Sequence, residues 1–138
     1  MIYDESSTAF VTDAMYVFRL KPEVKPLAFM AIVHSKLFSY LYRVANQGEA
    51  RVIPQVKASK LYALPYPKYN SSDPIVTKLI NECRSMLALN RRLADAKTPD
   101  LVTQLRRQTE LTDRAIDQLV YEIYGLTPEE IAMVEKSI

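Results

Sequence analysis

An apolar stripe between Pro26 and Gly48 constrains the fold more than any other part of the sequence. Its members recur at spacings of three and four residues, which places them on one face of an α-helix: Leu27, Met30, Ala31, His34, Leu37, Phe38, Leu41 and Val44. Pro26 suits a first helical turn, and Gly48 can close the helix after Asn46 or Gln47. The pattern therefore predicts one buried helix of about five turns.

Short extended segments are expected on both sides of this helix. Residues 14–20 alternate with largely apolar side chains on both faces, which is typical of a covered strand. After Gly48, residues 51–54 are β-branched at Val52 and Ile53 and end on Pro54, which favours a short edge strand. The run Leu64-Pro65-Tyr66-Pro67 predicts a stiff polyproline II exit.

The rest of the chain carries helix signals. Asp73 before Pro74 and Thr98 before Pro99 are each a cap residue followed by a good first helical residue. Two long apolar stripes follow these starts, so we expect an antiparallel helical hairpin. Residues 127–130 have the capping-box pattern of a last short helix. The predicted fold class is therefore α+β, mostly α: a small strand-helix-strand unit, a long antiparallel helical hairpin and a short C-terminal helix.

Composition limits the possible functions. The 138 residues suit one ordinary domain, and a formal net charge of +2, with basic and acidic residues mixed, gives no concentrated basic face. A single cysteine excludes an internal disulfide framework, and two glycines leave no Gly-rich loop for a nucleotide. No apolar run approaches the ~18 residues of a membrane span. These features predict a soluble, cytoplasmic protein that is not a self-contained nucleotide-using enzyme.

Two stretches of the chain resemble a known family. The first contains His34-Ser35-Lys36-Leu37-Phe38, Gly48, residues 52–57, Leu61 and residues 64–67; the second contains residues 115–127, Glu129-Glu130-Ile131 and Val134-Glu135. Their residues, order and separation are similar to the C-terminal part of Type IIG and TaqI-like bacterial restriction-modification DNA methylases, and more loosely to Type I specificity subunits. His34 stands where the family usually has Asn. Together the stretches cover a little over half of the chain.

The resemblance implies a domain organisation and a function. Residues 1–69 would be the C-terminal part of a target-recognition (specificity) domain, and residues 70–138 a helical arm with a terminal short helix. The chain would then recognise DNA without catalysing a reaction, since the Asn-Pro-Pro-aromatic motif that grips a flipped adenine is missing. S-adenosylmethionine would be bound by a separate catalytic methylase domain or subunit, which becomes an expected partner. The alternative is a helical protein-interaction or dimerisation module without a nucleic-acid role.

Seven polar residues around the extended segment are the candidate DNA-binding residues: Arg43, Gln47, Arg51, Gln55, Lys57, Ser59 and Lys60. Arg and Gln can reach base edges with two hydrogen bonds, whereas Lys and Ser more often contact phosphates. A solvated rim is the equally weighted alternative. We expect no catalytic, cofactor-binding or metal-binding residue in the chain.

Other polar residues have structural interpretations. His34 is interpreted as a packed or capping residue in preference to a ligand or base, and Cys83 as a small core hydrophobe in preference to a nucleophile. Glu129 and Glu130 are interpreted as a helix start. For the pairs Arg91-Arg92 and Arg106-Arg107 a solvated face is favoured over phosphate contact.

The hairpin also suggests self-association. Two helices cover only one seam of each other, and Leu101, Leu111 and Tyr121 are expected to remain on the far flanks. A second copy packed about a two-fold axis is the commonest way to cover such a surface, so we expect a possible homodimer through the helical arm.

Overall fold

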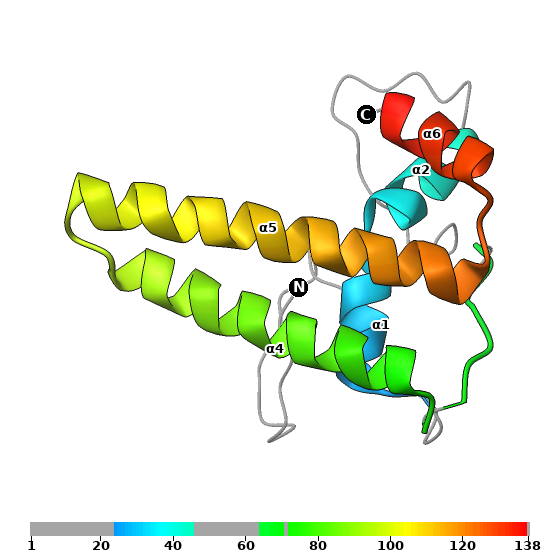
Figure 1. The fold of residues 1–138 in the computed structure, drawn as a ribbon, viewed down its shortest axis with the longest axis horizontal. Helices are drawn as coiled ribbons and strands as arrows, with labels where there is room; N and C mark the ends of the chain where they lie inside the picture. The colour runs from blue at the N-terminus through cyan, green and yellow to red at the C-terminus, as the bar shows by residue number, and fades with distance from the viewer. Residues whose placement is uncertain (1–23, 46–63, 71, 138) are drawn as a thin grey trace, which may run out of the picture.

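The computed structural model describes residues 24–45, 64–70 and 72–137. They form the helices α1 (Pro26–Val33), α2 (Lys36–Ala45), α4 (Pro74–Asp95), α5 (Pro99–Tyr124) and α6 (Pro128–Lys136). Helices α4 and α5 run antiparallel as a long hairpin, α1 packs against the hairpin near its open end, and α2 and α6 lie beside the same end of α5 (Figure 1).

The predicted α+β class is wrong for the part of the chain that the structure describes. Helices account for 79% of these residues, and no strand is found among them. The two predicted strands, residues 14–20 and 51–54, lie outside the described residues. The physical reason is that the apolar faces of the described helices cover one another: α1 buries most of its residues against α4, and no sheet is needed to close this core.

The single helix predicted from Pro26 to Asn46 or Gln47 is also wrong, because the helix breaks at Ser35. The Ser35 hydroxyl donates to the Ile32 carbonyl at 2.6 Å and accepts from the backbone N–H of Phe38 at 3.3 Å. Serine is a favoured N-cap because its oxygen satisfies an N–H that the first helical turn leaves unpaired. Ser35 therefore ends one helix and starts the next, although the apolar spacing continues across the break.

The predicted starts of the three later helices are confirmed. The carboxylate of Asp73 accepts from the N–H of Ile75, and the hydroxyl of Thr98 accepts from the N–H of Leu101. Thr127 and Glu130 form a reciprocal capping box. In each cap the bonded residues are only two or three positions apart, so the helix starts are fixed by local contacts.

Helix α5 ends at the glycine that the sequence suggests. Gly125 has φ of 68°, the left-handed conformation that closes a helix at little cost only when the residue lacks a Cβ. The turn leads the chain into α6, which packs against α2, and Val134 of α6 is buried.

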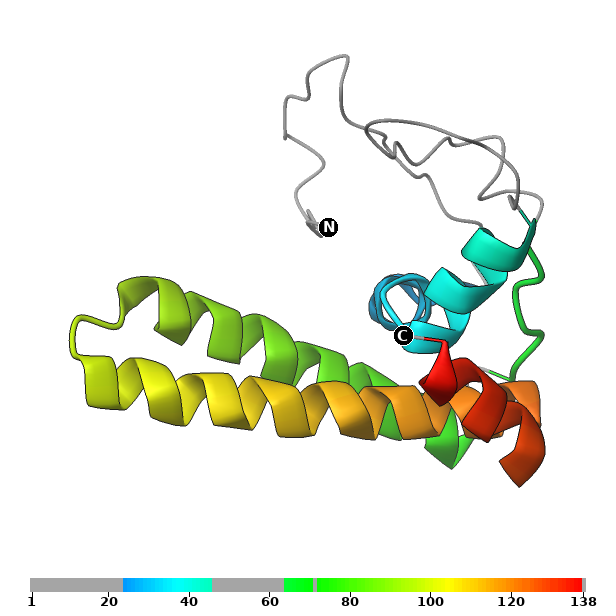
Figure 2. The same cartoon turned by 90° about the horizontal axis from the view of Figure 1, so that it is seen from above.

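One apolar core joins residues from both sides of the predicted domain division at residues 69 and 70. It includes the buried side chains Ile32, Phe38, Val76, Leu79, Cys83, Ile116, Val120, Tyr121 and Val134. The hairpin continues well past this core (Figure 2). Between residues 84 and 107, which we call the distal arm, Leu105 is the only buried residue.

None of the helices in the described ranges combines the length and apolar character that crossing a bilayer requires.

Candidate functional site

Only one of the seven predicted DNA-binding residues lies among the residues that the structure describes. Arg43 is exposed in the last turn of α2, and its Nη1 donates to the backbone carbonyl of Ser137 at 3.3 Å. The other six, Gln47, Arg51, Gln55, Lys57, Ser59 and Lys60, lie outside the described residues. Their convergence with Arg43 stays a prediction.

A polar junction forms where the start of α2 meets α5 and α6. We use the name junction for Ser35, Lys36, Asp117, Tyr121 and Glu135. The backbone N–H of Lys36 donates to Asp117 Oδ1 at 2.9 Å, across 81 positions of sequence. Because the N-terminus of a helix carries partial positive charge, a carboxylate there is stabilising. Asp117 thus completes the capping of α2 that Ser35 begins.

Asp117 is buried to an unusual degree for an acidic residue, with 2% of its surface exposed. Burial raises the pKa of its carboxyl, while the hydrogen bond from Lys36 opposes that rise. Its second oxygen, Oδ2, has no hydrogen-bond partner among the described residues. Asp117 also lines a cavity of about 140 Å³, together with Lys36, Arg114, Gln118 and Glu135, and this cavity is polar and roomy enough for ordered water.

Glu135 connects α6 to this junction. One of its oxygens accepts from Lys36 Nζ at 3.1 Å and the other from the Tyr121 hydroxyl at 2.9 Å. Partial burial alone would raise the pKa of Glu135, but these two donors lower it below its usual value. Burial and the same hydrogen bond raise the pKa of Tyr121, so its hydroxyl stays protonated and donates. The junction therefore ties three helices together with one ion pair and two further hydrogen bonds.

Tyr121 contradicts the sequence-based expectation that it remains on an uncovered flank of the arm. It is 1% exposed, because α6 folds back over α5 after Gly125. Leu101 and Leu111 are exposed as expected, at 36% and 58%.

A second set of contacts holds the segment 64–70 against α1 and α5. The Tyr124 hydroxyl donates to the Pro65 carbonyl at 2.7 Å, and burial raises the pKa of Tyr124 to about 12. The hydroxyls of Tyr66 and Tyr69 lie 3.1 Å apart, and the ring of Tyr66 packs against Phe29 with centroids at 5.7 Å. These contacts fix the position of the Leu64-Pro65-Tyr66-Pro67 exit.

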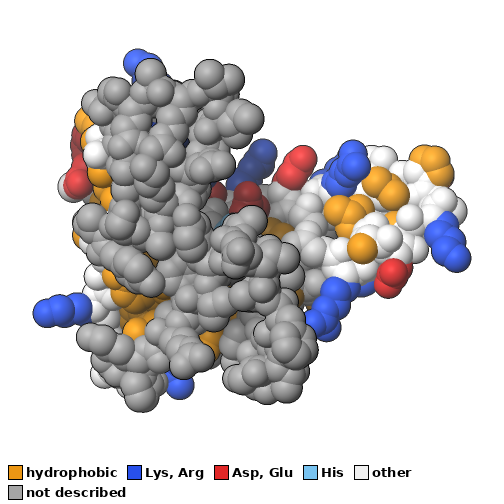
Figure 3. Space-filling model, turned by 180° about the vertical axis from the view of Figure 1, so that it is seen from behind, with side chains coloured by type: hydrophobic (Ala, Val, Ile, Leu, Met, Phe, Trp, Pro, Cys, Tyr) orange, Lys and Arg blue, Asp and Glu red, His pale blue; other side chains and the backbone are white. Residues whose placement is uncertain are grey.

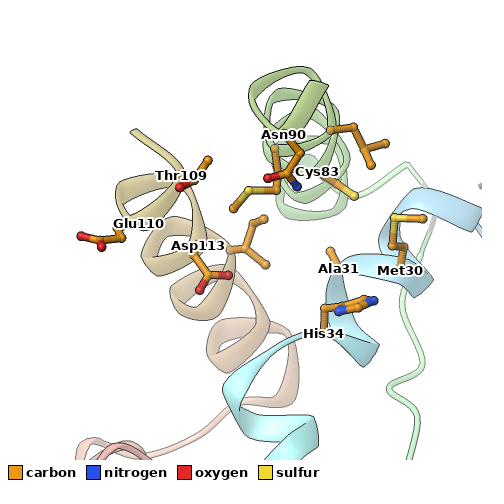
Figure 4. A pocket seen from close by; sticks show the side chains of 11 residues that line it. Met30, Ala31, His34, Cys83, Asn90, Thr109, Glu110 and Asp113 are labelled. Carbon is orange, nitrogen blue, oxygen red and sulfur yellow. The ribbon is translucent and has the colours of Figure 1, made fainter. Parts of the chain in front are cut away.

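A second cavity lies between α1, α4 and α5, near the end of α1 (Figure 4). Its volume is about 500 Å³, and apolar side chains including Met30 and Met86 line it together with His34, Asn90 and Asp113. Glu110 points away from the other labelled side chains. Burial lowers the pKa of His34, which favours a neutral imidazole.

Cys83 lies in this cavity wall, and the interpretation as a small core hydrophobe is confirmed by its burial. Only 4% of the residue is exposed, and burial raises the pKa of its thiol, which disfavours the reactive thiolate. No group of three metal-ligating side chains is found in the ranges that the structure describes.

No protein-family model, curated protein or solved structure matches this chain. Any function assigned to the chain therefore rests on its residues and on the contacts between them.

Sequence reasoning missed the junction, although one signal for it was present. Asp117 lies three residues before Val120 and four before Tyr121, both buried, so helical spacing alone places its carboxylate on the covered face of α5. A charged residue on a covered face needs a partner. The partner, the backbone N–H of Lys36, becomes available only because the helix breaks at Ser35.

Proposed function

We propose that this chain is the C-terminal part of a restriction-modification adenine methylase, the end of its target-recognition domain followed by a helical arm. In this proposal the chain contributes to DNA recognition. Methyl transfer from S-adenosylmethionine takes place in a separate catalytic domain or subunit.

One observation supports this proposal above the others: the two stretches that resemble the methylases pack against each other. Lys36, from the first stretch, bonds to Asp117 and Glu135 from the second. Pro65, also from the first, accepts from Tyr124 of the second. Residues that are separated by 59 to 99 positions thus form one structural unit.

The position of α2 is consistent with a recognition role. Its first turn is fixed by the junction, and its exposed last turn carries Arg43 directly before the polar segment 47–60. A helix held at one end keeps Arg43 in a defined position, which limits the entropy lost when this side chain binds.

DNA binding by the full chain tests the proposal. Fluorescence anisotropy with a labelled duplex at low salt should give a Kd of ~10⁻⁴ to 10⁻⁶ M, the range of non-specific binding. Arg51→Ala or Lys57→Ala should weaken this binding, because each removes a charge from the predicted contact segment. Lys25→Ala, which removes a charge from an exposed residue before α1, is the matched control. No anisotropy change up to ~100 µM protein would refute DNA recognition by this chain.

Catalysis provides a second test of the same proposal. Incubation of the pure chain with plasmid DNA and labelled S-adenosylmethionine should leave the DNA unlabelled and uncut. Saturating label transfer would contradict the assignment of catalysis to another domain.

A protein-interaction module is the second candidate, and the exposure of Leu101 and Leu111 favours it. In this case the arm would pack against a second copy of the chain. Sedimentation equilibrium distinguishes the states: a mass near 15.8 kDa at all concentrations indicates a monomer and removes the homodimer.

A further inference from the structure

We propose that the distal arm, residues 84–107, binds the phosphate backbone of duplex DNA. This inference rests on the proposed function and adds a second contact surface to it, separate from the segment around Arg43. It also differs from the interpretation of the arginine pairs as a solvated face, which the sequence favoured.

Charge is strongly polarised along the hairpin. The distal arm contains two acidic residues, Asp95 and Asp100, and six basic residues: Arg84, Arg91, Arg92, Lys97, Arg106 and Arg107. Its net charge is therefore +4, whereas the whole chain carries +2. The remaining part of α5, residues 108–124, has four acidic residues and one basic residue and is net negative. The mixed charge of the sequence as a whole conceals a basic region at one end of the molecule.

The basic side chains of the distal arm are available to a ligand. All six residues are exposed. The only ion pair within the described ranges, Lys36 with Glu135, lies at the opposite end of α5, so none of the six is neutralised by a described carboxylate. Figure 3 shows Lys and Arg side chains along both edges of the arm and at its tip.

The residue types and their spacing suit phosphates. Five of the six basic residues are arginines, whose planar guanidinium groups bind phosphate oxygens with two hydrogen bonds. Arg84 and Arg91 are seven residues apart, so they lie on one side of α4 about 10 Å from each other. This separation is comparable to the Debye length of ~8–10 Å at moderate ionic strength, so neighbouring charges reinforce each other's potential.

The apolar residues of the arm favour DNA over a second copy of the chain. A helix needs apolar residues that repeat on one face to form a seam with a partner helix. Leu101 is the exposed large apolar residue of the distal arm, and Leu111 lies just beyond the arm on α5. The two are ten residues apart and thus about 80° apart around α5, so they do not form a stripe. The exposed surface of the arm is better matched to a polyanion than to an apolar partner.

The experiment compares two variants of the full chain that lose the same charge. The arm variant carries Arg91→Gln, Arg92→Gln, Arg106→Gln and Arg107→Gln; glutamine is a good helix former, so the helices should persist. The control variant carries Lys25→Gln, Lys68→Gln, Lys78→Gln and Lys136→Gln, four exposed residues outside the distal arm. Circular dichroism confirms that both variants retain the helical content of the parent.

Duplex binding is then measured by anisotropy between about 20 and 200 mM salt. Each arginine that contacts a phosphate contributes ~0.9 to the slope of log affinity against log salt. We expect the arm variant to lower the slope by ~2 or more and the affinity at low salt by about tenfold or more. The control variant should change the affinity by less than about threefold.

Three results would overturn the inference, and they differ from one another. Equal losses of DNA affinity in the two variants would show that only net charge matters, and the inference would be wrong. The parent chain would still bind DNA in that case, so the proposed function would not be refuted. Unchanged DNA binding by the arm variant together with lost self-association in sedimentation would make the arm a protein-docking surface. Absence of binding by the parent chain would refute the proposed function itself.

Discussion

The two ends of the α4–α5 hairpin are stabilised in different ways. At the core end, α1, α2 and α6 cover the hairpin, and the junction adds charged hydrogen bonds between elements far apart in sequence. In the distal arm only the other helix of the pair is present, and Leu105 alone is buried. The core end therefore supplies most of the packing that stabilises the hairpin, whereas the distal arm carries the positive charge to which we have assigned DNA binding as a proposal.

Leucine truncations should show the largest difference between the two ends. Leu79 is 0% exposed in the core, and Leu79→Ala should destabilise the protein by ~3–5 kcal/mol, since the packed helices around it cannot collapse into the cavity. Leu105→Ala in the distal arm should cost only ~2 kcal/mol, because two helices can close the gap. Urea unfolding followed by circular dichroism measures both values.

Leu111→Ala is the matched control, since 58% of Leu111 is exposed and its truncation should change stability by less than ~0.5 kcal/mol. If Leu79→Ala and Leu105→Ala were equally destabilising, the distinction between the two ends would fail.

Substitution of Asp117 should have the next largest effect. Asp117→Ala leaves the partly buried N–H of Lys36 without its acceptor and should cost ~1–3 kcal/mol. Asp117→Asn keeps an acceptor oxygen, and should cost less than Asp117→Ala. The order of the two variants in urea unfolding tests the role of the carboxylate as a cap: an equal loss in both would indicate that negative charge, not the acceptor, is what α2 needs.

Acidification should produce the smallest of these effects, through Glu135. The pKa of Glu135 is lowered in the folded state, so its contribution is present above the unfolded pKa and is lost as pH falls through the folded pKa. Because Glu135 is partly exposed, we expect a contribution of no more than ~1 kcal/mol. Glu135→Gln should reduce the loss of stability between about pH 5 and pH 3.

Asp117 changes the stability with pH in the opposite direction to Glu135, over a neighbouring pH range. Its pKa is raised in the folded state, so the unfolded chain ionises first and stability falls as pH rises from the unfolded to the folded pKa. Asp117→Asn should remove this fall. Thermal unfolding of the parent and both variants across this pH range measures the two effects; identical profiles for Glu135→Gln and the parent would contradict the assignment to Glu135.

Local signals in the sequence predicted the later helices well and the middle of the chain poorly. Asp73, Thr98 and Thr127 start helices where the sequence indicated, and Gly125 ends one. The apolar spacing from Leu27 to Val44 predicted one helix, whereas Ser35 divides it in two. Leu37 and Phe38 remain buried on the far side of the break. The apolar spacing therefore continues across Ser35 and does not reveal that the helix ends there.

The candidate site was predictable only in part. Arg43 is exposed as the DNA-binding hypothesis requires, but the junction was not foreseen, because its partners lie up to 99 positions apart. The basic character of the distal arm was hidden by the mixing of charges along the chain, and became evident once the hairpin separated residues 84–107 from the acidic part of α5.

The sequence by itself determined the local features of this protein: the caps of α4, α5 and α6, the left-handed turn at Gly125 and the hairpin between residues 74 and 124. The caps and the turn depend on contacts within a few residues of the chain, and the hairpin follows from two apolar stripes joined by a short connection, so side-chain type and spacing suffice to predict them. Tertiary structure decided the burial of Tyr121 and the pairing of Asp117 with the start of α2, and this pairing adds to the local bonds by which Ser35 divides the helix. The physical reason is that a buried carboxylate and an unpaired helix N-terminus satisfy each other only when packing brings them together.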